Sequence, residues 1–243
     1  MARDVVVSDV LLCSGKRASL FIYIRSTWSY EKQGHRKEWN LLGLTELFIF
    51  LVPVIISIFV YSAMTGQETL RVLIVGSGLA GLTAARILRE SHEVTIYERS
   101  AKTFAREGQG LSTTPNAVRI LDSIGFDRTR AGSVESEGYR TYDKSGKLLQ
   151  EIDPKMKETF GASSLTHLRV DVRNELVRLA TAPSAELGIV GEPAEIVYDT
   201  PVIDLDAENG AVTLIDGSEV KADLVIGMCG QMHVLSTTVM EFG

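Results

Sequence analysis

The sequence predicts an α/β fold built on a parallel sheet, and three observations near residue 75 predict it. An apolar run at 72–75 leads directly into a G-x-G-x-x-G turn that begins at Gly76. A helical pattern follows the turn. A second apolar strand pattern at 94–97 then ends at Glu98, 17 residues after the last glycine. Strand, turn, helix, strand and acid in this order are typical of the βαβ unit of a Rossmann-like, dinucleotide-binding domain.

A physical reason explains why each of these three positions in the turn is a glycine. Gly76 permits the tight turn, Gly78 lets the backbone approach a pyrophosphate, and Gly81 lets the helix pack closely on the sheet. The phosphates would lie at the positive N-terminus of the helix. Glu98 is placed to accept hydrogen bonds from ribose hydroxyls and would repel the 2′-phosphate of NADP, so FAD or NAD is favoured. The candidate cofactor-binding residues here are Gly76, Ser77, Gly78, Leu79, Ala80, Gly81, Glu98 and Arg99.

Composition narrows the class of partner. The chain has 243 residues, 45% of them hydrophobic, and a formal net charge of -6 without a dense basic stripe. This balance argues against a nucleic-acid partner and favours a small molecule. The two cysteines, Cys13 and Cys229, lie far apart, and the histidines lack metal-ligand spacing, so we expect neither a disulfide framework nor a metal site.

The N-terminal part differs from the rest. Residues 1–46 are predicted to be an N-terminal extension, and 47–64 to be a candidate transmembrane helix, because 47–63 contains no charged residue. At about 1.5 Å per residue this run reaches only the shorter end of what spans a bilayer. The alternative is a chain that naturally begins at Met64. The two hypotheses predict a single-pass membrane protein and a cytoplasmic protein, respectively.

Alternating helix and strand patterns continue beyond Glu98. Residues 113–125 read as a capped helix, 139–152 as a hairpin, and 171–180 as a second helix. Short strands with intervening turns are predicted at 194–198, 202–206, 211–215 and 224–226.

In this context residues 69–227 resemble the front part of the FAD-dependent aromatic monooxygenases of the para-hydroxybenzoate hydroxylase and salicylate hydroxylase type. Four blocks in the family's order and spacing carry the resemblance: VLIVGSGLAGLTAARIL with YERS, GQGLSTTPNAVRILDSIG, LRVDVRNELVRLA, and VTLIDGSEVKADLVIG. The resemblance implies an FAD-binding domain at 69–227, interrupted at about 137–165 by a hairpin of an inserted, β-rich substrate domain.

The resemblance also implies a chemistry. Family members hydroxylate a small aromatic substrate with FAD, NAD(P)H and O₂. The three glycines correspond to those around the FAD pyrophosphate, and Glu98 corresponds to the acid on the adenosine ribose. Arg169 corresponds to an arginine on the flavin side of the cofactor. The alternative is that Arg169 and Asp171 only begin a helix, where Asp171 favours the N-terminus. No catalytic residue is identified, and the choice between NADH and NADPH stays open.

The resemblance ends after Gly227. A family Asp-Gly motif is expected at 229–230, but Cys229 stands in place of the aspartate. We therefore expect 228–243 to be a tail unrelated to the family, and the chain to be truncated and of little turnover. Two alternatives stay open: a non-catalytic, membrane-anchored nucleotide-binding fragment, and an NAD-dependent dehydrogenase, which fits the glycines but not the later blocks.

Overall fold

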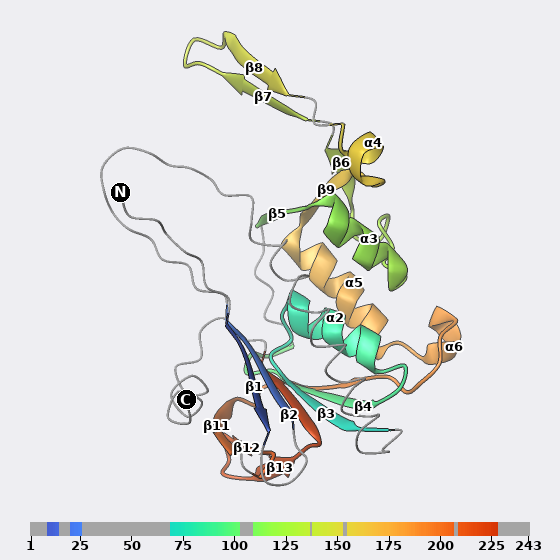
Figure 1. Cartoon of the computed structure of the whole chain (residues 1–243), viewed down its shortest axis with the longest axis vertical. Coiled ribbons are helices and arrows are strands. Elements are labelled where there is room, and N and C mark those ends of the chain that lie inside the picture. Colours follow the sequence, from blue (N-terminus) through green and yellow to red (C-terminus); the bar gives the residue numbers. More distant parts are fainter. Residues whose placement is uncertain are drawn as a thin grey trace.

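A six-stranded sheet lies in the lower half of the molecule as drawn in Figure 1, with helices above it. The computed structural model describes residues 9–14, 20–25, 69–102, 109–136, 138–152, 155–206 and 209–227. In spatial order the strands of the sheet are β1 (Asp9–Ser14), β2 (Leu20–Arg25), β14 (Leu224–Gly227), β3 (Arg71–Val75), β4 (Glu93–Tyr97) and β10 (Glu195–Val197). Neighbours from β2 to β10 pair in parallel, and β1 pairs antiparallel with β2.

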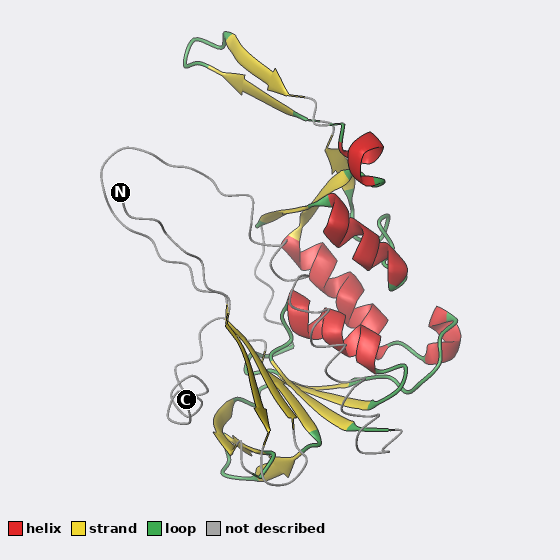
Figure 2. Ribbon diagram, in the orientation of Figure 1, coloured by secondary structure: helices red, strands yellow, loops and turns green. Residues whose placement is uncertain are grey.

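Different layers cover the two faces of this sheet (Figure 2). On one face lies α2 (Leu79–Leu88), and α5 (Arg169–Thr181) packs on α2. Farther from the sheet, beyond α5, lies α3 (Pro115–Ser123). The other face carries an antiparallel three-stranded sheet of β11 (Val202–Asp206), β12 (Ala211–Leu214) and β13 (Glu219–Lys221).

Strand β3 shows why the apolar run has no polar interruption. Val72 and Ile74 belong to the cluster under the helices, whereas Leu73 and Val75 belong to the cluster under the three-stranded sheet. All four side chains are buried, because successive residues of a strand point to opposite faces and both faces are covered. The strand therefore holds the following glycine turn at a fixed edge of the sheet.

A second antiparallel sheet, in the order β5-β9-β6, lies beyond the helices. Its strands are β5 (Gly110–Thr113), β9 (Ser164–Leu168) and β6 (Val134–Ser136). His167 of β9 is buried, and its ring nitrogens lie 3.0 Å from the Thr113 hydroxyl and 2.8 Å from the Ser133 hydroxyl. Because β9 runs straight into α5, this sheet fixes where that helix begins.

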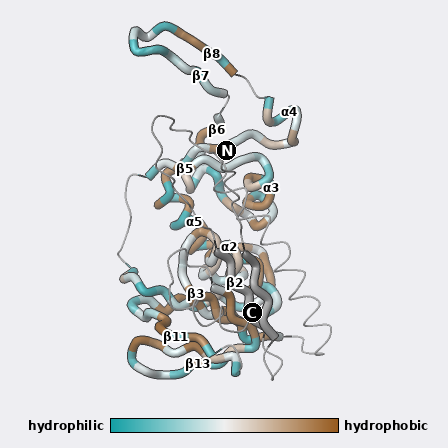
Figure 3. Tube along the Cα trace, turned by 60° about the vertical axis from the view of Figure 1, so that its left-hand side comes forward, coloured by the Kyte–Doolittle hydropathy of each residue, from teal (hydrophilic) through white to brown (hydrophobic). Residues whose placement is uncertain are grey.

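An arm extends from this sheet (Figure 1). It is the hairpin of β7 (Tyr139–Tyr142) and β8 (Leu148–Ile152), followed by the short helix α4 (Met156–Phe160). Hydrophobic residues concentrate along β8 (Figure 3). One further short helix, α6 (Ser184–Leu187), follows α5.

Most predicted elements are confirmed. The helix at 113–125 is α3, with Thr114 at the N-cap, Pro115 in the first turn, and Gly125 in the left-handed region at φ 81° just after the helix. The hairpin at 139–152, the helix at 171–180 and the four later strands are also present, with ends shifted by at most two residues.

The antiparallel strands β5, β6 and β9 were not predicted, nor were β1 and β2 within the N-terminal extension. In the described ranges no helix is both long and apolar enough to cross a bilayer. The candidate transmembrane segment 47–63 lies outside those ranges.

Candidate functional site

Two of the three glycines of the turn are required by the protein itself. Gly76 has φ 101°, in the left-handed region that favours glycine, and its N–H donates to the Tyr97 carbonyl over 2.9 Å. At Gly81 an added Cβ would lie 2.1 Å from the Gly76 carbonyl oxygen and 3.3 Å from Cγ2 of Ile74. Gly81 thus allows α2 to pack directly on the end of β3, as the sequence predicted.

Gly78 has a different environment. It is the N-cap of α2, with extended backbone at φ -70° and ψ 176°, and a Cβ added there would meet no protein atom within 4 Å. No side chain caps this helix end, and the first turn holds no acidic residue. The N–H groups at the start of α2, which include those of Leu79 and Ala80, have no acceptor within the helix and can donate to an anion.

Glu98 lies beside the turn and accepts hydrogen bonds from Ser77 and Ser100. Its Oε2 accepts from the Ser77 N–H at 2.7 Å and from the Ser77 hydroxyl at 2.8 Å, and its Oε1 accepts from the Ser100 N–H at 2.8 Å. Burial raises the pKa of Glu98, but the hydrogen bonds from Ser100 and Ser77 outweigh it and hold the pKa below its ordinary value. Glu98 is therefore an anion at neutral pH.

Arg173, on α5, completes this group and was missed by the sequence reasoning. Its Nη2 donates to the Ser77 hydroxyl over 2.8 Å. Ser77 itself is almost fully buried, with 1% of its surface exposed. The available signal was the four-residue spacing of Arg169 and Arg173, which places both on one face of a helix.

The remaining candidates occupy less defined positions. Arg169 is the first residue of α5; its N–H donates to the Gln109 carbonyl over 2.9 Å, and its side chain is half-buried. It lies one helical turn from Arg173 on the same face of α5. Arg99, directly after Glu98, is exposed. Hydrogen bonds of Ser77 thus connect the turn with Glu98 and with α5, and Arg169 lies at the N-terminal end of that helix.

Metal-ligating side chains do not gather in the part of the chain that is described: no group of three or more His, Cys, Asp or Glu residues could hold an ion there. The groups that can act at the site are backbone N–H donors, one carboxylate and arginines. This set suits an anionic, hydroxyl-bearing ligand such as a dinucleotide.

Comparison with known proteins identifies the class. The FAD binding domain family matches residues 69–225, well over half of the chain. The chain therefore belongs to this family of FAD-binding domains, and FAD is the cofactor of the domain.

Curated relatives point in the same direction. The chain is 34% identical over 178 residues to hispidin-3-hydroxylase of Neonothopanus nambi, an alignment that covers 72% of this chain and 41% of the relative. It is 31% identical over 173 residues to 6-hydroxynicotinate 3-monooxygenase of Pseudomonas fluorescens, covering 68% and 41%. The chain spans about two fifths of the length of the curated relatives it matches.

Solved structures agree on the fold. The crystal structures of 2-methyl-3-hydroxypyridine-5-carboxylic acid oxygenase resemble this chain with a TM-score of 0.51 and 27% identity, over 65% of this chain and 39% of theirs. Relatives of the chain are thus flavin-dependent hydroxylases of small aromatic rings, as the sequence resemblance implied.

Proposed function

We propose that this domain binds FAD at the glycine turn and Glu98, and that it serves the hydroxylation of a small aromatic substrate with NAD(P)H and O₂. The observation that carries the proposal is the space at Gly78. A Cβ would meet no protein atom there, so packing within the protein does not explain the glycine, whereas a ligand that approaches the backbone at an uncapped helix end does. The family match and the hydroxylase relatives supply the reaction type.

Each part of the site has a role in this proposal. The turn from Gly76 to Gly81, which includes Ser77, holds the pyrophosphate, and the backbone N–H groups of Leu79 and Ala80 are its donors. The N–H groups of Gly76 and Ser77 donate within the protein instead. Glu98 accepts from the adenosine ribose, with Arg99 flanking it. Arg169 contacts the flavin side, where its fixed positive charge favours an electron-rich ring. FAD supplies the redox and oxygen chemistry when bound, and the protein supplies position and shielding from water.

The proposed domain organisation follows from the same assignment. Residues 69–227 form the FAD-binding domain, and the arm at about 137–165 belongs to a substrate domain. Residues 1–46 form an extension, and 228–243 a tail outside the family. The segment 47–63 is proposed as a single-pass anchor. Fractionation of cells that express the full chain tests it, because recovery only in the cytosolic fraction would leave the cytoplasmic alternative.

FAD binding is tested by titrating the purified 243-residue chain with FAD and following flavin fluorescence. We expect saturable binding, and a Gly78→Ala variant with affinity reduced by about tenfold or more, because the added methyl group occupies the space that the pyrophosphate needs. The thermal midpoint of the ligand-free variant is the control, and it should match that of the wild type. Equal FAD affinity in the two proteins would contradict the assignment of the site.

A second candidate function is FAD binding without catalysis. It is favoured by Cys229, which stands where the family resemblance expects the aspartate of an Asp-Gly motif. The two functions are separated by NADPH and NADH oxidation in the presence of hydroxylated aromatic acids. Substrate-stimulated oxidation supports the monooxygenase. Binding of FAD without any such stimulation supports the non-catalytic alternative.

A further inference from the structure

Ser77 links an arginine on one element to a carboxylate on another. Its hydroxyl lies 2.8 Å from Glu98 Oε2 and 2.8 Å from Arg173 Nη2. A serine hydroxyl has a single hydrogen, and a guanidinium can only donate. The direction of both hydrogen bonds is therefore fixed: Arg173 donates to Ser77, and Ser77 donates to Glu98.

The burial of Ser77 strengthens the two hydrogen bonds from Arg173 to Ser77 and from Ser77 to Glu98. Ser77 occupies the second position of the glycine turn and is almost fully buried, so the hydrogen bonds operate with little competition from water. A hydroxyl that receives a hydrogen bond from a cation is polarised and becomes a stronger donor. Arg173 thus strengthens the hydrogen bond between the Ser77 hydroxyl and Glu98 Oε2, and through this bond it fixes the orientation of the carboxylate.

Packing of α5 on α2 does not depend on this arginine. Val172, Leu176 and Leu179 of α5 belong to the same buried cluster as Leu82 and Ala85 of α2. The Arg173 side chain is only half-buried, and the hydrogen bond given above directs it to the cofactor turn. A role at the site therefore explains its orientation better than a role in joining the two helices.

We propose that Arg173 is a positioning residue for cofactor binding: through Ser77 it orients Glu98 toward the hydroxyls of the adenosine ribose. This inference rests on the proposed function, which places the ribose at Glu98. It adds a residue outside both the glycine motif and Arg169, and it predicts which part of the ligand that residue affects.

The test compares ADP with 2′,3′-dideoxy-ADP, which lacks both ribose hydroxyls, by calorimetry on the full chain. The wild type should bind ADP about tenfold more tightly than the dideoxy compound, the gain expected for a hydrogen bond to a charged group. In Arg173→Gln this preference should fall to about twofold or less. A group that only bound phosphate, or only joined the helices, would weaken both ligands equally and leave the ratio unchanged.

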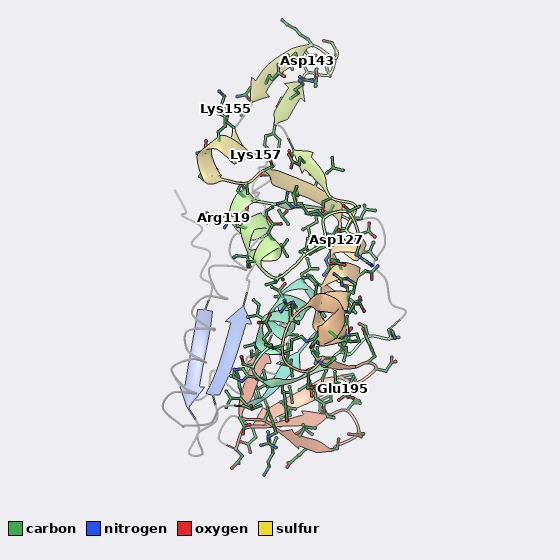
Figure 4. The ribbon with its side chains drawn as sticks, turned by 90° about the vertical axis from the view of Figure 1, so that its right-hand side faces the viewer. Arg119, Asp127, Asp143, Lys155, Lys157 and Glu195 are labelled. Carbon is green, nitrogen blue, oxygen red and sulfur yellow. The ribbon has the colours of Figure 1, made fainter. Side chains whose placement is uncertain are left out.

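A second arm tests the route through Ser77. Ser77→Ala should lose the preference for ADP over the dideoxy compound. The double variant Ser77→Ala with Arg173→Gln should lose no more, because both substitutions interrupt the same series of hydrogen bonds. Arg173→Lys, which still donates, should recover most of the ratio. Arg119→Gln, on the exposed side of α3, is the matched control and should behave as the wild type (Figure 4).

The outcomes separate the two proposals. A wild type that binds neither FAD nor ADP overturns the proposed function. If the wild type binds FAD and prefers ADP, but Arg173→Gln keeps that preference, the positioning role alone is overturned. The same holds if the effects of Ser77→Ala and Arg173→Gln add. Should Arg173→Gln fold poorly, Arg173→Lys and Ser77→Ala carry the test, and an undiminished preference in Ser77→Ala contradicts the inference.

Discussion

At the scale of single residues, the glycines of one turn serve different purposes. Gly81 is confined by protein atoms, with the Gly76 carbonyl oxygen 2.1 Å from the position of its missing Cβ, whereas Gly78 is not confined within 4 Å. A methyl group at Gly81 must displace α2 from β3. A methyl group at Gly78 displaces no atom of the ligand-free protein.

We therefore expect Gly81→Ala to lower the free energy of unfolding by about 2 kcal/mol or more, as overpacking does. Gly78→Ala should leave it unchanged or raise it by about 0.5 kcal/mol, because alanine restricts the unfolded chain. Urea denaturation of both ligand-free variants measures the difference. Equal destabilisation would mean that Gly78 also has a structural purpose.

Glu98 gives a pH dependence with a defined sign. Despite its burial, the hydrogen bonds from Ser100 and Ser77 lower its pKa in the folded protein. A carboxylate with a lowered pKa contributes stability that is present above the pKa of the unfolded chain, about 4.3, and is lost as pH falls through the folded value.

The wild type should accordingly lose more stability between about pH 5 and about pH 3 than Glu98→Gln does. Urea midpoints at several pH values for the two proteins measure this difference. Asp143, an exposed carboxylate in the hairpin turn whose pKa is also lowered by hydrogen bonds, provides the comparison variant Asp143→Asn. Parallel acid profiles for wild type and Glu98→Gln would contradict the hydrogen-bonded anion described above.

At the scale of elements, one buried arginine joins the ends of three helices. Arg89, at the C-terminal end of α2, is fully buried. Its Nε donates to the Glu192 carbonyl at 3.0 Å, its Nη1 to the Leu179 carbonyl at 3.0 Å, and its Nη2 to the Ser184 hydroxyl at 2.9 Å. These partners lie at the end of α5, in α6, and in the loop that leads to β10.

Arg89→Met should therefore destabilise the fold by about 3 kcal/mol, because it removes three hydrogen bonds and leaves the buried Leu179 carbonyl without this donor. Arg130→Met is the matched control: Arg130 is 61% exposed and pairs with Asp127 three residues earlier, so its loss should cost about 0.5 kcal/mol or less. Chemical denaturation of both variants compares them. A similar small effect at both sites would show that the Arg89 contacts contribute little.

At the scale of the whole molecule, the arm of β7 and β8 leaves apolar side chains uncovered. Leu149 is 61% exposed, and Tyr142 and Ile152 of the same hairpin are also exposed. Uncovered apolar surface of this kind promotes association. We expect Leu149→Lys to reduce self-association while changing the free energy of unfolding by about 0.5 kcal/mol or less, because no packing is lost.

Light scattering at increasing protein concentration, together with denaturation, tests this expectation. Leu165→Lys provides the contrast, since Leu165 is 2% exposed in a buried cluster and its charged replacement should unfold the protein. Unchanged association of Leu149→Lys would show that the arm is not the associating surface.

Predictability differed between parts of the molecule for identifiable reasons. The α3 and α5 helices and the hairpin have local signals: a cap, an apolar period or a turn sequence. Strands β5 and β9 were missed because each is only four or five residues long and pairs with a partner more than 50 residues away. Such pairing leaves little trace in a local pattern.

The sequence by itself determined the βαβ unit, the glycine turn and the position of Glu98, because each depends on backbone geometry or periodicity over a few neighbouring residues. It also determined the family, because four blocks within residues 69–227 keep the family's order and spacing. Only the tertiary structure decided which side chains complete the site. Ser77 and Arg173 are 96 positions apart, and they meet because α5 packs against α2 beside the turn. The residues next to Ser77 or Arg173 in the sequence do not predict that contact. It forms because the apolar faces of α2 and α5 are buried against each other.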